Sequence, residues 1–323
     1  MAAQAEFDPD PGKAEEIAPG LRRILAPNPS PMTFRGTNTY LIGRRELALV
    51  DPGPDDPAHL SALLAAIGGA RLRHILVTHS HRDHSGLVSA LARATGAPVL
   101  AFGGPEAGRS AAMAELAAEG LIGGGEGTDT SFAPDRCLAD GESLELEDGT
   151  MEALHTPGHM GNHLCFAWNG AIFSGDIVMG WSSSLVSPPD GDLADFYRSC
   201  ARLRARPETV LYPAHGAPVA DPAARIDALV AHRRGREAQI LAALAEGPGT
   251  LPALTERIYH DVGRALWPAA SRNLLAHLVE MSGRGLVSAE PALSPAAVFS
   301  EGQEQKSKSG GKTLLHPPGA LDR

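Results

Sequence analysis

The stretch from Ile75 to His84 constrains this chain more than any other part of the sequence. It reads ILVTHSHRDH, an apolar run that stops at four metal-capable side chains within six positions. The apolar part is typical of a buried strand, and the residues from Ser85 onward are typical of a helix. We therefore expect the cluster on a strand-to-helix turn at the end of a sheet, where ligands from several strands can converge. Imidazole and carboxylate together suit zinc or another first-row metal.

Three further segments have the same form, an apolar strand that ends in a metal-capable residue beside glycine. Together with the first cluster they make seven candidate ligands, which are too many for one tetrahedral zinc. Two metals that share one bridging carboxylate would use them all. The predicted sets are His79, His81 and His159 on one metal, Asp83, His84 and His215 on the other, and Asp176 as the bridge.

A site with two metals predicts that the protein is a hydrolase. The two metals would lower the pKa of a shared water, so that a bridging hydroxide exists at neutral pH, and they would polarise a carbonyl or phosphoryl oxygen. Asp83 is the ligand that we expect to orient the hydroxide and to pass its proton to the leaving group. We predict two Zn²⁺ per chain, with iron or manganese as alternatives.

The other histidines are not needed as ligands. His155 and His163 are expected to support the ligands or to fill the core. His59 and His74 are expected at the surface. No GxSxG motif is present, so the sequence does not support a serine hydrolase.

The order of elements predicts two domains. Strands alternate with interspersed helices in two successive halves up to residue 221, which indicates a layered sandwich with helices outside. From Pro222 three helices precede a glycine turn and a short extended segment, Leu286–Ser288, which is the order of a winged-helix unit. The expected boundaries are 1–221, 222–295 and a polar tail over 296–323 that we expect to be disordered.

Composition and charge restrict the surroundings and the partners. The chain has 323 residues and three well-separated cysteines, which predict no disulfide framework and favour a reducing cytoplasm. We find no signal peptide and no apolar run long enough to span a membrane. The net charge is −10, with 12 basic and 26 acidic residues over 1–197 and 16 and 12 over 198–323. The mildly basic second part could attract an anionic substrate.

Over about residues 35–220 the chain resembles the metallo-β-lactamase-fold hydrolase superfamily. The residues that carry the resemblance are Asp51, the His79-x-His81-x-Asp83-His84 motif, His159, Asp176 and His215. The resemblance implies an α/β (α+β) fold, an αββα sandwich, and the same two-metal division of ligands. It also implies that Asp51 supports the cluster without binding metal.

Within this superfamily the chain is most similar to the β-lactamase-like-protein-2 subfamily. The similarity rests on the segments Gly36–Leu41, Met179–Ser184 and Ser187–Asp192. This subfamily carries a C-terminal winged-helix-like domain and includes a single-strand-specific endoribonuclease. The resemblance thus implies a phosphodiesterase that cleaves single-stranded RNA.

Other functions stay open. The alternative is a thioester or other small-molecule acyl hydrolase, as in glyoxalase II, for which a negative net charge is no handicap. A β-lactamase is less favoured because Asp176 stands where the commonest class has cysteine. A nucleic-acid-binding regulator that contains metal is also less favoured. The expected partner is therefore single-stranded RNA or a small ester or thioester, and no membrane.

The winged-helix-like unit has its own expectation. Its candidate recognition helix carries Arg272, Asn273 and His277 but few other basic residues. A DNA reader would present basic residues toward the groove. We therefore expect this unit to pack on the catalytic domain or to form a homodimer rather than to read bases.

Overall fold

The computed structural model describes residues 6–121, 123 and 127–302. The chain forms two compact units, Met1–Arg234 and Gly235–Arg323. The division falls inside helix α7, Pro222–Ala245, which begins at the residue where the sequence predicted the second domain to start. No helix of the described residues is long and apolar enough to cross a membrane.

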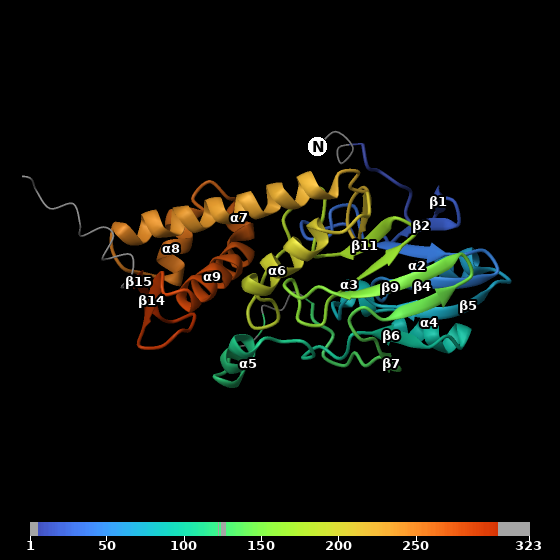
Figure 1. Cartoon of the computed structure of the whole chain (residues 1–323), viewed down its shortest axis with the longest axis horizontal. Helices are drawn as coiled ribbons and strands as arrows, with labels where there is room; N and C mark the ends of the chain where they lie inside the picture. Colours follow the sequence, from blue (N-terminus) through green and yellow to red (C-terminus); the bar gives the residue numbers. More distant parts are fainter. Residues whose placement is uncertain (1–5, 122, 124–126, 303–323) are drawn as a thin grey trace, which may run out of the picture. The chain divides into compact units, whose positions relative to one another are not determined.

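The first unit contains a seven-stranded sheet with strands in chain order (Figure 1). Neighbours from β1 to β4 are antiparallel, and those from β4 to β7 are parallel. The strands are β1 (Ala14–Ala18), β2 (Leu21–Leu25), β3 (Asn38–Ile42), β4 (Glu46–Val50), β5 (Arg71–Leu76), β6 (Val99–Ala101) and β7 (Arg136–Cys137).

A second sheet of five strands has the order β12-β11-β10-β9-β8. Only the pair β11–β12 in this sheet is parallel. The strands are β8 (Ser143–Leu146), β9 (Gly149–His155), β10 (Leu164–Trp168), β11 (Ala171–Gly175) and β12 (Val210–Pro213). Parallel pairs at the ends of both sheets send several strand ends to one edge, which is the arrangement that a convergent site needs.

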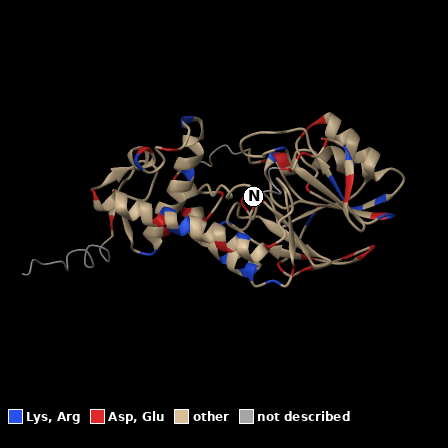
Figure 2. Ribbon diagram, turned by 90° about the horizontal axis from the view of Figure 1, so that it is seen from above, with Lys and Arg blue, Asp and Glu red and all other residues tan. Residues whose placement is uncertain are grey.

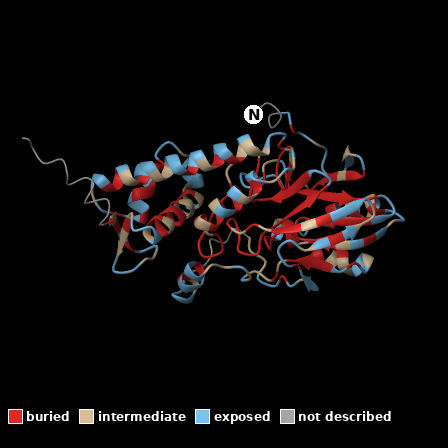
Figure 3. Cartoon of the chain, in the orientation of Figure 1, coloured by how far each residue is buried: buried red, intermediate tan, exposed pale blue. Residues whose placement is uncertain are grey.

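Period-two alternation on β3 and β4 separates two hydrophobic cores. Tyr40 and Val50 pack with Phe166 and Phe173 of the second sheet, so this core lies between the sheets. Their neighbours Leu41 and Leu49 lie in a second core on the opposite face. Figure 3 shows the resulting buried residues along both sheets. The expected sandwich is therefore correct, and both faces of the larger sheet are covered.

Helices cover the sheets and connect the strands. The second core takes in apolar residues of α2 and α4, so these two helices cover the outer face of the seven-stranded sheet. Helix α6 lies against the β9–β10 loop, where Ser199 donates to the Pro157 carbonyl at 2.6 Å. The helices of this unit before α7 are α2 (Pro57–Ile67), α3 (Arg82–Ser85), α4 (Val88–Thr95), α5 (Ala111–Ala118) and α6 (Leu193–Arg204).

The second unit has a helical core and a small sheet. Its helices after α7 are α8 (Leu251–Ile258), the 3₁₀ turn η1 (Arg264–Leu266) and α9 (Trp267–Gly283). Strands β13 (Gly249–Thr250), β14 (Val287–Glu290) and β15 (Val298–Glu301) form a sheet in the order β13-β15-β14. This confirms the winged-helix expectation.

Two details differ from the sequence-based expectations. Strand β1 lies in the lead-in where a single strand was expected, because it pairs with β2 in a hairpin. Strand β15 lies beyond residue 295, where a tail was expected, and it is ordered by pairing with both β13 and β14. Residues 303–323 of that tail lie outside the described residues. All three cysteines are free, in agreement with the absence of a disulfide framework.

Candidate metal centre

The seven predicted ligands come from several segments at one edge of the two sheets. His79 and His81 follow β5, and the short helix α3 begins at Arg82, inside the motif, so that Asp83 and His84 lie on one helical turn. The other three ligands are His159 in the β9–β10 loop, Asp176 directly after β11 and His215 shortly after β12. The structure therefore brings together residues that are up to 136 positions apart, and their role as ligands stays a prediction.

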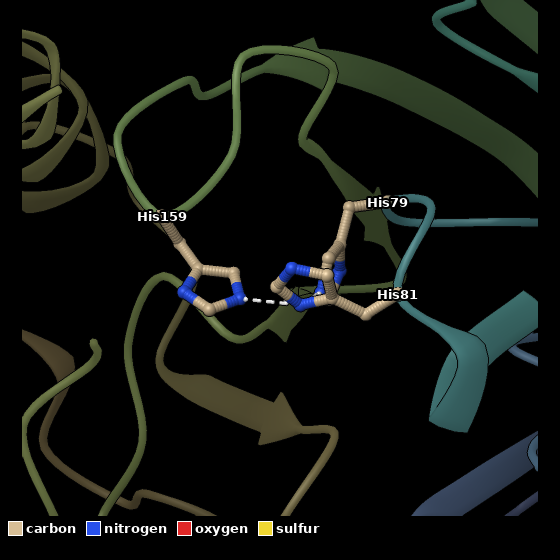
Figure 4. Close-up of side chains that lie close together, drawn as sticks. All are labelled: His79, His81 and His159. Carbon is tan, nitrogen blue, oxygen red and sulfur yellow. Dashed lines mark hydrogen bonds between the residues drawn. The ribbon is translucent and has the colours of Figure 1, made fainter. Parts of the chain in front are cut away.

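Three histidines form the first group. Nε2 of His79 and Nε2 of His159 lie 3.0 Å and 3.1 Å from Nδ1 of His81. Figure 4 shows the three rings pointing toward one another, with His79 and His81 on the segment after β5 and His159 on the β9–β10 loop. All three are buried. Three imidazole nitrogens facing one point are suited to a single metal ion.

Two histidines and a carboxylate form the second group. Oδ2 of Asp83 lies 3.3 Å from Nε2 of His215 and 3.5 Å from Nε2 of His84. The two histidine side chains are fully or almost fully buried, whereas the side chain of Asp83 is 25% exposed. Asp83 is therefore the member of this group that reaches solvent.

Asp176 lies between the two groups. Its Oδ2 is 3.6 Å from Nε2 of His159 in the first group and 3.7 Å from Nε2 of His84 in the second, and its Oδ1 is 3.4 Å from Nε2 of His215. Nε2 of His84 and Oδ1 of Asp176 are shielded from solvent and have no hydrogen-bond partner among the described residues. Buried polar atoms are normally satisfied, so these converging atoms fit a binuclear metal site with Asp176 as the shared ligand.

The electrostatics of the two groups differ. Burial, together with the neighbouring imidazoles, holds the pKa of His79 well below its usual range and lowers the pKa of His81 to about 3. Burial also opposes protonation of His215, but Asp176 and Asp83 outweigh it and raise its pKa to about 10. His79 and His81 are thus neutral imidazoles that are ready to bind a cation. The second group is an ion-paired cluster in which a metal would replace protons.

Asp51 supports the candidate centre through hydrogen bonds to Thr78 and His84, as the resemblance implied. One carboxylate oxygen accepts the backbone N–H of Thr78 at 2.8 Å, and the other accepts the Thr78 hydroxyl at 2.8 Å and lies 2.9 Å from Nδ1 of His84. The carboxylate fixes the orientation of the His84 ring, so that its Nε2 faces the centre.

His163 also supports the centre, as the sequence allowed. Its Nε2 accepts the backbone N–H of Asp176 at 3.2 Å, and its Nδ1 lies 3.0 Å from the Thr156 hydroxyl. His155 does not face the ligands, because its ring stacks on Phe102 and its Nε2 bonds the Gly161 carbonyl at 2.9 Å. The expectation of a surface position was wrong for His59, which is 1% exposed and lies 3.0 Å from the Thr39 hydroxyl.

Sequence reasoning missed the contacts that hold the segment after Asp176. The Ser184 hydroxyl donates to the carbonyls of Asp176 and, at 2.9 Å, of Ile177. Two arginines of α7 bind other carbonyls of the same segment, Arg225 those of Met179 and Ser182 and Arg233 that of Ser184. Figure 2 marks basic residues along α7. Contacts from a side chain to a distant carbonyl have no local sequence pattern, so no signal could have found them.

The candidate recognition helix of the second unit lies within α9. His277 is 1% exposed and is part of the buried face of that helix. It is therefore not available to a nucleic-acid ligand, while Arg272 and Asn273 are partly exposed. The expectation that the unit does not read bases stays a prediction.

Comparison with protein families gives two matches. Residues 32–215 match the Metallo-beta-lactamase superfamily, and residues 250–293 match the Beta-lactamase associated winged helix domain. The first match contains all seven predicted ligands. The second begins at the last residue of β13 and extends three residues past β14.

Similar proteins cover most of the chain. A Beta-lactamase-like protein 2 homolog of Drosophila melanogaster is 32% identical over 276 residues, which are 81% of this chain and 88% of the relative. An Atrochrysone carboxyl ACP thioesterase of Claviceps purpurea is 31% identical over 253 residues, 76% of this chain and 71% of the relative. A solved metallo-beta-lactamase family protein of Thermus thermophilus aligns with a TM-score of 0.71 at 29% identity, over 88% of this chain and 99% of that one.

Proposed function

Because this chain belongs to the metallo-beta-lactamase superfamily and is a hydrolase, we propose that it is a binuclear metal-dependent thioester hydrolase. The sequence favoured single-stranded RNA as the substrate and kept acyl hydrolysis as the alternative. The relative described above whose name states a specific activity is a thioesterase, which supports the alternative. This similarity, which extends over about three quarters of the chain, is the observation that carries the proposal.

The charge of the chain agrees with this choice. Nonspecific binding of a polynucleotide draws most of its affinity from phosphate neutralisation by Lys and Arg. The chain has a net charge of −10, and six of its seven predicted ligands lie in the acidic part, residues 1–197. A small neutral thioester needs no such neutralisation.

The residues present fit two metal ions, which we propose to be Zn²⁺. His79, His81 and His159 would hold one, Asp83, His84 and His215 the other, and Asp176 would be shared. Such N and O donor sets suit zinc, and they also accept iron or manganese. When bound, the two ions would make water nucleophilic at neutral pH and polarise the acyl carbonyl.

We assign the proton transfer to Asp83. It is the most exposed of the three carboxylates that contact the His84 ring, and its Oδ2 lies near two imidazoles that stabilise its charge. In the proposed reaction the oxygen of water bonds to the acyl carbon, and the carbon–sulfur bond breaks. Asp83 takes a proton from the water and gives it to the thiolate, so the products are a carboxylic acid and a thiol.

The experiment is turnover of the N-acetylcysteamine thioester of acetic acid by the zinc-loaded full chain, beside cleavage of a labelled single-stranded RNA. We expect thioester turnover that is lost in His81→Ala and Asp176→Ala while both variants keep the wild-type circular dichroism. Zinc content by mass spectrometry shows whether each variant has lost metal. RNA cleavage with no thioester turnover would refute the proposal and restore the first expectation.

A further inference from the structure

Two loops beside the metal centre are each bonded to a predicted ligand. The β2–β3 loop contains Gly36, whose carbonyl accepts Nδ1–H of His215 at 3.1 Å. A Cβ at Gly36 would lie 2.1 Å from the Ala26 carbonyl oxygen, so the loop is closely packed at this point. The loop after β11 begins at Asp176, whose carbonyl accepts the Ser184 hydroxyl. Side chains on these two loops are therefore held in fixed positions relative to the candidate metal centre.

An aromatic contact joins the two loops. The rings of Phe34 and Trp181 stack with centroids 5.1 Å apart and planes inclined by 19°. Phe34 also stacks on Phe7 at 6.3 Å and 23°. The three rings thus form a nearly parallel row, in which Trp181 is the end member and stacks on no further ring among the described residues.

The backbone at Phe34 is in a conformation that bulky residues avoid. Its φ is +57°, in the left-handed region that favours glycine or asparagine. The turn is set by its neighbours, because Gly36 N–H bonds the Thr33 carbonyl at 2.9 Å and the Thr33 hydroxyl bonds the Asn28 carbonyl. Strained residues of this kind cluster at ligand sites. The position would suit glycine, but this chain has a phenyl ring there.

The backbone around Trp181 is also fixed by hydrogen bonds. Arg225 donates to the Met179 carbonyl and to the Ser182 carbonyl, both at 2.6 Å, so one guanidinium fixes the backbone on both sides of the indole. Phe34 and Trp181 are nevertheless partly exposed, and Met32 on the same loop as Phe34 is 45% exposed. Rigid, partly exposed rings lose little conformational entropy when they bind a ligand.

We infer that Phe34 and Trp181 form the binding surface for the acyl group of the substrate, and that this group is flat and aromatic. The inference rests on the proposed thioesterase function. A planar acyl group would extend the row of rings by stacking on Trp181, with its carbonyl toward the loop that begins at Asp176. A flexible alkyl chain would gain apolar contact but no parallel stacking.

The experiment compares N-acetylcysteamine thioesters of 2-naphthoic, octanoic and acetic acids with the zinc-loaded full chain. We expect Trp181→Ala to lower kcat/KM at least tenfold for the naphthoyl thioester, less than threefold for the octanoyl thioester and less than twofold for the acetyl thioester. Phe34→Gly, which keeps the backbone conformation, should act in the same direction. Leu266→Ala, an exposed apolar residue of the other unit, is the control and should change none of the three.

A binding measurement separates failure of this inference from failure of the proposed function. The probe is the ketone analogue of the naphthoyl thioester, with CH₂ in place of sulfur, titrated calorimetrically. Binding to the wild type that weakens tenfold in Trp181→Ala supports the site even if no thioester is hydrolysed. Equal losses for all three substrates, an octanoyl loss as large as the naphthoyl loss, or unchanged analogue binding would overturn it.

Discussion

The backbone N–H of Asp176 donates to Nε2 of His163 at 3.2 Å. Burial and the neighbouring His159 hold the pKa of His163 well below its usual range, so this nitrogen stays unprotonated and able to accept. The predicted shared ligand, Asp176, is therefore placed by a histidine outside the predicted ligand set. Gly175 makes the contact close, because a Cβ there would lie 2.5 Å from Nε2 of His163.

We expect His163→Leu to weaken zinc binding by about 10- to 100-fold, which is the usual effect of losing a residue that orients a ligand. His163→Gln should recover part of the affinity, because its amide oxygen can accept the same N–H. Zinc affinity is measured by competition with a chromophoric chelator. His260→Gln, an exposed histidine of the second unit, is the control. Wild-type affinity in the leucine variant would show that the contact does not place Asp176.

The metal content tests the two-ion division. Wild-type protein should contain two zinc ions per chain, and His215→Ala should contain one, because only the second group loses a ligand. Zinc that binds the folded chain alone should also stabilise it by about 2.7 kcal/mol at a free concentration of about 100 times Kd. Mass spectrometry gives the stoichiometry, and thermal unfolding with and without chelator gives the stabilisation. One ion in the wild type would refute the division.

Gly158 precedes His159 and has no room for a side chain. Its φ is +144°, and a Cβ would lie 2.5 Å from Cα and 2.7 Å from N of Phe196, near the start of α6. Because backbone cannot move aside cheaply, we expect Gly158→Ala to cost about 3 kcal/mol or more of unfolding free energy. The matched control is Gly170→Ala, where φ is +78° but the space is empty, and about 1 kcal/mol is expected. Urea denaturation measures both, and equal costs would contradict the steric argument.

His59 makes the stability depend on pH. Burial lowers its pKa to about 4, against 6.5 in the unfolded chain. Between these values the unfolded state binds more protons, so the folded state loses stability as the pH falls from about 6.5 to 4. At a pH of about 4.5 the loss from this residue is about 2 to 3 kcal/mol. Between pH values of about 7.5 and 4.5, we expect the unfolding free energy of His59→Gln to fall by about 2 to 3 kcal/mol less than that of the wild type.

The measurement for His59 is urea unfolding of both proteins at several pH values with the same zinc load. Release of metal at low pH is common to the two proteins, so the difference between them reports on His59 alone. Parallel stability curves would show that His59 does not titrate in this range.

Much of the centre was predictable because its residues occupy short, repeated patterns. Four apolar strands lead to predicted ligands, three of them beside glycine, and strand ends at one sheet edge must lie close together. The same reasoning identified the sandwich from alternating strands and helices, and the winged-helix unit from its order of elements. These features depend on local sequence, so they can be predicted without knowing which segments contact one another in the folded chain.

The tertiary structure alone decided how the predicted ligands are held and which residues lie beside them. Phe34 and Trp181 are 147 positions apart, and Arg225 reaches back 46 residues to the Met179 carbonyl. Helix α3 begins inside the ligand motif, where the sequence placed a turn, and the Asp51 carboxylate bonds both Thr78 and His84 there. Contacts of this kind join a side chain to a distant backbone group or ring. They follow from how the sheets and loops pack, and that packing leaves no pattern within any one segment of the chain.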